Sequence, residues 1–332
     1  MKSIAIFNNK GGVGKTTLVC NLASFLSTQK NKKVLVIDTD PQCNTSTYVL
    51  SDDDFYNTYY SNDVFTVNDI ITSLLKGEGY LKNFVPSRSE TFGVDIIPGS
   101  PKFARSEDFL AKEWGDVMSS QIRGIRTNML FVHFLSLCSN YDYVFFDMGP
   151  SLGALNRAVL LACDYFITPM SSDIFSLLAL ENIGVSIGQW KSTFNDSITK
   201  LDPMFKDSLN GLRTQCTIKY LGYIEQQYIT KIVDGKKRAV RSYEKILEQI
   251  PSEIEKHIIK PINNDMYDID YNIGSIPNFY SLVPMSQTAH KPIFKLNNSD
   301  GVLGAHYKKV VDYLDLMKEI SAKVLSNMEV IL

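Results

Sequence analysis

Residues 3–17 read S-I-A-I-F-N-N-K-G-G-V-G-K-T-T, and this stretch decides the fold. The apolar run at 3–8 has the length and composition of a buried parallel strand. A glycine-rich turn follows it, and residues 16–29 then carry apolar side chains at helical spacing. A second buried strand is expected at 33–37, directly before Asp38. Strand, glycine loop, helix and strand in this order predict an α/β fold with a doubly wound, mostly parallel sheet.

The rest of the chain continues the alternation of strands and helices. Strands are expected at 92–97, 143–146, 165–169 and 216–224, with 276–283 as a last strand or its loop. Helices are expected at 67–75, 104–118, 125–138, 175–190, 240–259 and 304–328. Residues 51–62 and 192–214 lack a clear hydrophobic period and are expected to form loops. Because strands lie on both sides of 192–272, we expect one domain over 1–332 with an inserted helical and loop segment there.

The composition is that of a globular protein without a strong electrostatic bias. Hydrophobic residues make up 44% and charged residues 21% of the 332 positions, which is enough for a large core. The net charge of −2 gives no overall attraction to nucleic acid or anionic lipid, so any basic surface must be local. The five cysteines are odd in number and form no C-x-x-C pair, which predicts reduced thiols in a cytoplasmic protein. Neither a secretory leader nor a membrane span is expected.

The run K-G-G-V-G-K-T-T at 10–17 indicates a loop that binds the phosphates of a nucleotide. The general pattern G-x-x-x-x-G-K-[ST] ends here, although Asn9 occupies the position of its first glycine. Small residues let successive backbone N–H groups turn toward phosphate, and the dipole of the following helix favours the same charge. Lys15 can bridge the outer phosphates, and the Thr16 hydroxyl can coordinate Mg²⁺. The alternative is a glycine-rich turn that only happens to carry lysines. The expected nucleotide contacts are Lys10, Gly11, Gly12, Val13, Gly14, Lys15, Thr16 and Thr17.

Two aspartate segments follow expected strands, D-T-D-P-Q at 38–42 and D-M-G-P-S-L-G at 147–153. Ligands bind at the carboxyl ends of the strands in open parallel sheets. Phosphoryl transfer mainly needs a positioned water and neutralised charge, which carboxylates and a metal ion supply. The alternative for each segment is a turn or a helix start without chemistry.

With these motifs the chain resembles the ParA/MinD family of ATPases with a deviant Walker A motif. The additional lysine, Lys10, matches the family's signature lysine, which reaches the nucleotide held by a partner subunit. The resemblance implies catalytic roles for Lys10, Lys15 and Asp40, with Asp40 orienting the attacking water. It also implies metal contacts from Thr16, Asp40 and Asp147, and the ligands ATP and Mg²⁺.

The resemblance is weakest at 50–90 and 192–272. Gly149 replaces the first proline of the family's D-x-P-P-S-L segment, and this is expected to loosen the loop. By position, the resemblance places Gln226, Pro277 and Asn278 near the adenine base.

The DNA-partition members of the family carry arginines in the segment that matches 278–288, and this chain has none there. The most basic stretch is K-I-V-D-G-K-K-R-A-V-R at 231–241, which could contact DNA phosphates. A solvated loop and helix face is the alternative. The last helix mixes acidic and basic residues, so it is expected to pack against the protein rather than to anchor it to a membrane.

The leading hypothesis is a cytoplasmic ATPase that dimerises on ATP binding and hydrolyses ATP slowly to ADP and phosphate. It would act in plasmid or chromosome partition, with a ParB-like stimulator and non-specific DNA as partners. The alternative is a nucleotide-gated assembly subunit that recruits an effector protein in a mobile-element or defence system. The missing arginines and the inserted segment favour this alternative. A third hypothesis, a small-molecule ligase or kinase, requires a substrate pocket that the sequence does not identify.

Overall fold

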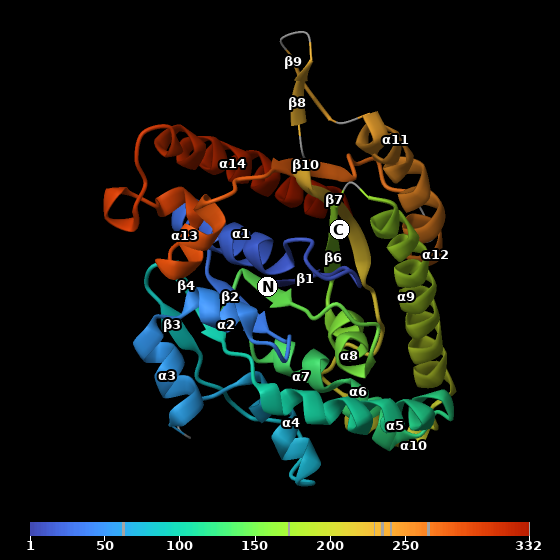
Figure 1. Cartoon of the computed structure of the whole chain (residues 1–332). Coiled ribbons are helices and arrows are strands. Elements are labelled where there is room, and N and C mark those ends of the chain that lie inside the picture. The colour runs from blue at the N-terminus through green and yellow to red at the C-terminus, as the bar shows by residue number, and fades with distance from the viewer. Residues whose placement is uncertain are drawn as a thin grey trace.

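The computed structural model describes residues 1–61, 64–171, 173–228, 230–233, 236–239, 241–263 and 266–331. For the described residues within 227–247 it gives the backbone but, apart from Ile246, no side chain. Its centre is an eight-stranded sheet with the order β10-β7-β6-β1-β5-β2-β4-β3 (Figure 1). The pairs are parallel except for β3, which runs antiparallel to β4, so the expected doubly wound sheet is confirmed. The strands are β1 (Lys2–Ile6), β2 (Val34–Asp38), β3 (Ser87–Ser89), β4 (Val94–Ile97), β5 (Tyr143–Asp147), β6 (Tyr165–Ser171), β7 (Lys219–Tyr228) and β10 (Asn272–Pro277).

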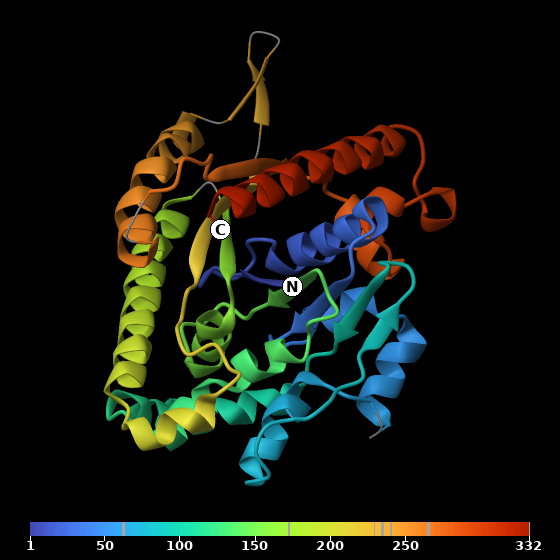
Figure 2. The ribbon, with the colours of Figure 1, turned by 180° about the vertical axis from the view of Figure 1, so that it is seen from behind.

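Helices cover both faces of the sheet (Figures 1 and 2). Successive residues of β1 face opposite layers, with Ile4 and Ile6 in one hydrophobic core and Ala5 in the other. This is why a parallel strand reads as a continuous apolar run. The layer that receives Ile4 contains α1 (Lys15–Lys30), α2 (Asn44–Val49), α13 (Leu282–Thr288) and α14 (His306–Ile331). The opposite layer contains α4 (Val67–Leu75), α5 (Ser106–Met118), α6 (Ile122–Asn128), α7 (Leu130–Ser136), α8 (Ala154–Ala162), α9 (Ile174–Lys200), α11 (Arg241–Ile254) and α12 (Lys260–Asn263).

The expectation of loops at 51–62 and 192–214 was wrong, because helices form much of both segments. The first contains α3 (Asp52–Tyr60), where the Ser51 side chain accepts a hydrogen bond from the backbone N–H of Asp54. Three aspartates in its first turn also stabilise the helix, because their negative charges lie at the positive end of the helix dipole. In the second, α9 continues to Lys200 and α10 (Pro203–Lys206) follows. Side-chain caps thus support α3 and α10, which have almost no buried residues.

Two expected helices are interrupted. The helix expected at 125–138 is divided at Met129 into α6 and α7. The one expected at 240–259 contains Pro251 inside α11 and then a π-helical turn at Glu255–Ile259 before α12. This turn lies so close to α9 that a Cβ added at Gly184 would collide with the carbonyl oxygen of His257. The irregular turn therefore packs closely against α9 at Gly184.

The segments around the last two strands also differ from expectation. The strand β10 ends at Pro277, and α13 begins at Leu282, where residues 276–283 were expected to form one strand or its loop. The basic stretch at 231–241 includes an antiparallel hairpin of β8 (Thr230–Val233) and β9 (Lys236–Ala239). Residues 234, 235 and 240, and the side chains of this stretch, lie outside the described part of the chain.

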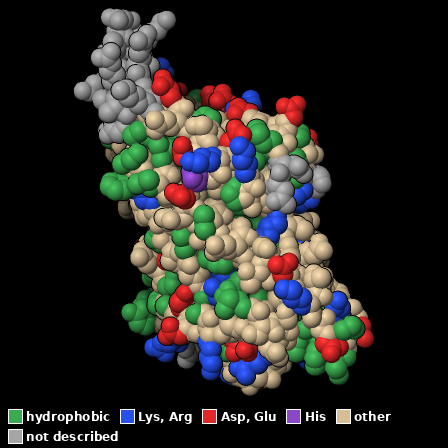
Figure 3. Space-filling model, turned by 90° about the vertical axis from the view of Figure 1, so that its right-hand side faces the viewer, with side chains coloured by type: hydrophobic (Ala, Val, Ile, Leu, Met, Phe, Trp, Pro, Cys, Tyr) green, Lys and Arg blue, Asp and Glu red, His purple; other side chains and the backbone are tan. Residues whose placement is uncertain are grey.

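The surface and the cysteines agree with the composition. Figure 3 shows basic, acidic and hydrophobic side chains interspersed over the side of the molecule that it displays. In the described ranges, none of the helices combines the length and the hydropathy needed to cross a membrane. All five cysteines are free and buried. Burial raises the pKa of the Cys138 thiol to about 12.

Candidate functional site

The phosphate loop connects β1 to α1. Gly12 and Gly14 have φ values of 72° and 75°, in the left-handed region that favours glycine. Gly14 is the N-cap of α1, and among the described residues no side chain caps this helix end. A helix N-terminus of this kind is suited to bind an anion through its backbone N–H groups.

The side chain of Lys15 is buried beneath this loop. Its Nζ donates hydrogen bonds to the carbonyl oxygens of Asn8 and Lys10, each at 3.1 Å. Burial lowers the pKa of Lys15, while the nearby carboxylates of Asp147 and Asp40 raise it. An ammonium group in this position gains from a bound polyanion, because the opposite charge compensates its lost hydration.

Asp147, at the end of β5, lies against the start of α1. Its Oδ2 accepts hydrogen bonds from the hydroxyls of Thr16 (2.7 Å) and Thr45 (2.6 Å). The other oxygen, Oδ1, is buried and has no hydrogen-bond partner within the described residues. Burial raises the pKa of Asp147 to about 6, against the effect of both threonine hydroxyls. A buried, unpaired carboxylate oxygen beside a threonine hydroxyl fits an Mg²⁺ site.

Asp38 and Asp40 differ in their surroundings. Asp38 is buried, and its Oδ2 accepts hydrogen bonds from the backbone N–H (2.8 Å) and hydroxyl (2.6 Å) of Ser46. It therefore shapes the segment, and burial raises its pKa to about 8. Asp40 faces the loop after β5, since a Cβ added at Gly149 would lie 3.4 Å from its carboxylate. Gly149 does not have a positive φ, and the expected loosening of its loop stays a prediction.

Lys10 forms an ion pair within its own chain. Its Nζ donates to Oδ2 of Asp173. Asp173 is the N-cap of α9, where its Oδ1 accepts hydrogen bonds from the backbone N–H groups of Phe175 and Ser176. Lys10 thus has an intramolecular partner in the single chain, and its contact with a second subunit stays a prediction. Sequence reasoning missed Asp173, although an aspartate before a helix is a capping pattern.

The start of α9 exposes large apolar side chains next to this ion pair. The exposed fractions are 49% for Ile174, 68% for Phe175 and 56% for Leu178. Their spacing places Ile174 and Leu178 one turn apart on the same face of the helix. Exposed apolar side chains in such a group are typical of an interaction surface.

A groove of about 800 Å³ runs along the phosphate loop, and residues 11–17, Asp40 and Pro150 line it. A smaller hollow adjoins it at Gly14 and Thr17 and brings together Gln226, Pro277 and Asn278. The three positions placed near adenine by resemblance therefore lie beside one another at the phosphate loop. Phe279, Val283 and Tyr313 also line the hollow and were missed.

Gln226 links the hollow to the phosphate loop. A Cβ added at Gly14 would lie 2.9 Å from its Oε1, so the amide packs directly on the glycine. The amide nitrogen of Gln226 is buried and unpaired within the described residues. It is an unused hydrogen-bond donor beside the phosphate loop, in a hollow of about 30 Å³.

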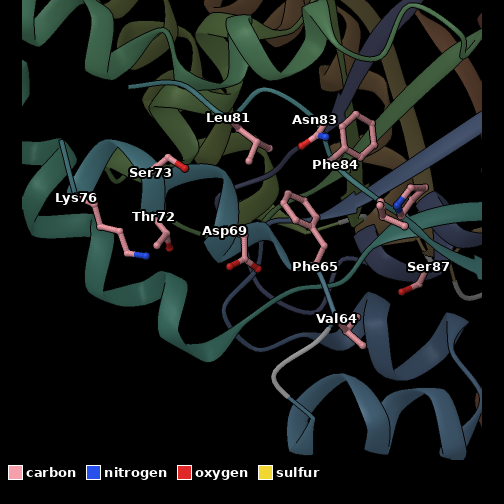
Figure 4. A pocket seen from close by; sticks show the side chains of 12 residues that line it. Val64, Phe65, Asp69, Thr72, Ser73, Lys76, Leu81, Asn83, Phe84 and Ser87 are labelled. Atoms are coloured by element: carbon pink, nitrogen blue, oxygen red, sulfur yellow. The ribbon is translucent and has the colours of Figure 1, made fainter. Parts of the chain in front are cut away.

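Another hollow, of about 610 Å³, lies beside α4 and shares no lining residue with the phosphate loop (Figure 4). Its apolar lining includes Phe65 and Phe84. The Asp69 carboxylate in its wall accepts hydrogen bonds from the backbone N–H and hydroxyl of Thr66 in a capping box. These contacts account for Asp69 as a structural residue.

Comparison with known proteins gives matches along most of the chain. Residues 1–200 match the family described as AAA domain. The virulence plasmid ParA family protein pGP5-D of Chlamydia psittaci is 30% identical over 238 residues, covering 72% of this chain and 81% of that protein. The chromosome partitioning protein ParA of Myxococcus xanthus is 27% identical, covering 69% and 74%. The sporulation initiation inhibitor protein Soj of Bacillus subtilis is 30% identical, covering 55% and 63%.

Solved structures share the whole fold. Protein DIP2308 from Corynebacterium diphtheriae has a TM-score of 0.73 and 26% identity, with 99% of each chain covered. A plasmid partition protein from Borrelia burgdorferi bound to AMPPNP has a TM-score of 0.59 and 20% identity, with 98% of each chain covered. At that identity the second likeness shows the fold alone.

Proposed function

We propose that this chain, which belongs to the ParA/MinD family of phosphate-loop ATPases, is a single-domain, ATP-dependent switch that dimerises around bound nucleotide. Proteins of this family generally hydrolyse nucleotides. The substrate proposed for this chain is ATP. The observation that carries the proposal is the Asp147 carboxylate: its Oδ2 accepts a hydrogen bond from Thr16, which lines the groove, and its buried Oδ1 is unpaired within the described residues. A carboxylate in this state is expected where a metal ion accompanies the phosphates.

Each residue where the groove meets the phosphate loop, here called the phosphate end, has a proposed role. The backbone N–H groups of 11–17 and the Lys15 ammonium bind the phosphates of ATP. Thr16 and Asp147 hold Mg²⁺, which supplies neutralisation of phosphate charge when bound. Asp40, with its carboxylate toward the groove, orients the attacking water and contributes to the metal shell. This division suits phosphoryl transfer, which depends on positioning and electrostatic stabilisation.

The smaller hollow that adjoins the groove, here called the base end, is proposed to select adenine. Gln226 and Asn278 offer side-chain amides, and Pro277 offers an apolar surface for the ring. The buried amide nitrogen of Gln226 supports a hydrogen bond to the base.

Dimerisation is supported by the position of Lys10. The ion pair with Asp173 leaves its side chain 29% exposed, beside the apolar start of α9. We propose that a second copy covers this surface when ATP is bound, and that Lys10 then leaves Asp173 for the partner's nucleotide.

Plasmid or chromosome partition is the proposed biological role, because relatives in the family are named as plasmid and chromosome partition proteins. The specific observation against transport on DNA is the absence of arginine from 278–288. It favours the second candidate, a nucleotide-gated subunit that recruits an effector protein.

The decisive experiment measures molar mass by light scattering with ATP, with ADP and without nucleotide, each in the presence of Mg²⁺. ATP-dependent doubling of the mass supports the switch, and the same mass in all three states would overturn it. Retention of random duplex DNA, measured in the same three states at low salt, separates the two roles. ATP-dependent retention supports partition, and its absence supports the assembly subunit.

A further inference from the structure

The loop after Asp147 is held from outside the sheet by α5. Glu107, in the first turn of α5, directs its carboxylate at the N-terminus of α8. Its Oε1 accepts a hydrogen bond from the backbone N–H of Ala154 at 2.5 Å, and its Oε2 accepts one from Leu155 at 3.0 Å. The N-cap of α8 is Gly153, which offers no side chain, so Glu107 supplies the cap from another helix. A Cβ added at Gly153 would collide with this carboxylate.

The capped end of α8 is joined to the catalytic carboxylate proposed above. Asn156, in the first turn of α8, donates hydrogen bonds from its Nδ2 to the carbonyl oxygens of Gly149 (2.8 Å) and Ser151 (2.7 Å). A Cβ added at Gly149 would lie 3.4 Å from the Asp40 carboxylate, so this loop lies next to Asp40 with room for little more than a methyl group between them. A continuous set of hydrogen bonds therefore runs from α5 through α8 to the loop that lies next to Asp40.

A second contact fixes the same two helices. Arg157, also in the first turn of α8, is buried with its guanidinium 4.2 Å from the ring centroid of Trp114 on α5. It donates a hydrogen bond to the carbonyl oxygen of Leu110 on α5 at 3.2 Å. Burial lowers the pKa of Arg157 to about 10, and the nearby charge of Glu107 acts in the opposite direction. The Glu107 carboxylate thus stabilises both the N-terminus of α8 and the buried positive charge of Arg157.

We propose that Glu107 is a positioning residue for ATP hydrolysis, which fixes the start of α8 and thereby the loop that faces Asp40. The inference rests on the proposed function of the chain as an ATPase. Displacement of a water-positioning group by about 1 Å can lower a rate about 100-fold. The phosphate loop has its own support on β1 and α1, so loss of Glu107 is expected to lower turnover much more than affinity for ATP.

The test compares Glu107→Gln with Glu113→Gln. Glu113 lies on the same helix and is buried, but its carboxylate accepts a hydrogen bond from Arg123 at 2.8 Å, away from α8. At saturating ATP we expect turnover in Glu107→Gln to fall by about 10-fold or more, with its Kd for ATP within about twofold of the parent value. Glu113→Gln should keep the parent turnover.

A second measurement needs no nucleotide. Hydrogen exchange of the amides at 148–157 should be faster in Glu107→Gln than in the parent and unchanged in Glu113→Gln. Parent-like turnover and parent-like hydrogen exchange in Glu107→Gln would overturn this inference and leave the proposed function intact. So would equal losses of turnover and ATP affinity, because they would show general damage. A parent protein that neither binds nor hydrolyses ATP would overturn the proposed function together with the inference.

Discussion

The two ends of the proposed nucleotide site are built in different ways. At the phosphate end, Lys15 and Thr16 begin α1 directly after the glycine loop, Asp147 ends β5, and Asp40 follows the neighbouring strand β2. At the base end, Gln226 comes from β7, Pro277 from β10 and Tyr313 from α14. Backbone N–H groups and a helix N-terminus can bind phosphate, so a short run of sequence specifies that end. Contacts to a base require side chains that only the strand order brings together.

This comparison predicts the largest effect for Lys15→Ala. Removal of the buried ammonium should raise the Kd for ATP at least about 100-fold, since charge-assisted hydrogen bonds to phosphate are lost. Isothermal titration with ATP and Mg²⁺ measures the change. Lys30→Ala, at the exposed far end of the same helix, is the matched control and should bind as the parent does. Comparable affinity in both variants would remove Lys15 from the site.

Asp40→Ala should separate binding from hydrolysis at the same end of the groove. We expect turnover to fall about 100-fold or more, because a positioning group for the attacking water is lost. The Kd for ATP should stay within a few-fold of the parent value. Phosphate release at saturating ATP gives the rate, and parent-like turnover would exclude Asp40 from the mechanism.

The base end should contribute less and should determine selectivity. Gln226→Ala is expected to weaken ATP binding about tenfold, or ~1.4 kcal/mol, through loss of a buried hydrogen bond. The preference for ATP over GTP should shrink with it. Competition titrations with both nucleotides measure this, and an unchanged preference would assign base selection to other residues of the hollow.

The smallest effect is expected where Lys10 meets Asp173. Asp173→Asn removes a partly exposed ion pair, and such pairs contribute about 1 kcal/mol or less. Freed from this partner, Lys10 should favour the ATP-bound dimer by about two- to fivefold. Sedimentation equilibrium with ATP measures the dimer constant. Since asparagine caps a helix as well as aspartate does, a weaker dimer would instead show that the Lys10–Asp173 ion pair itself supports the dimer.

Sequence reasoning predicted the sheet and the phosphate end because both are encoded locally. The buried strands β1 and β2 read as apolar runs, and the glycines between β1 and α1 have a backbone requirement of their own. Gln226 was placed only through family resemblance, and Tyr313 has no local pattern that would mark it. Glu107 was also missed, since a carboxylate that caps a distant helix looks like any residue in a first helical turn.

The burial of the five cysteines has a practical consequence. The thiolate is the nucleophile in alkylation, and burial both hides a thiol and raises its pKa, so the native chain should resist alkylation. Cys20 lies in the core beneath α14, whereas Cys138 lies in the core on the opposite side of the sheet. The order in which the two become alkylated during mild denaturation would therefore reveal which layer of helices detaches first.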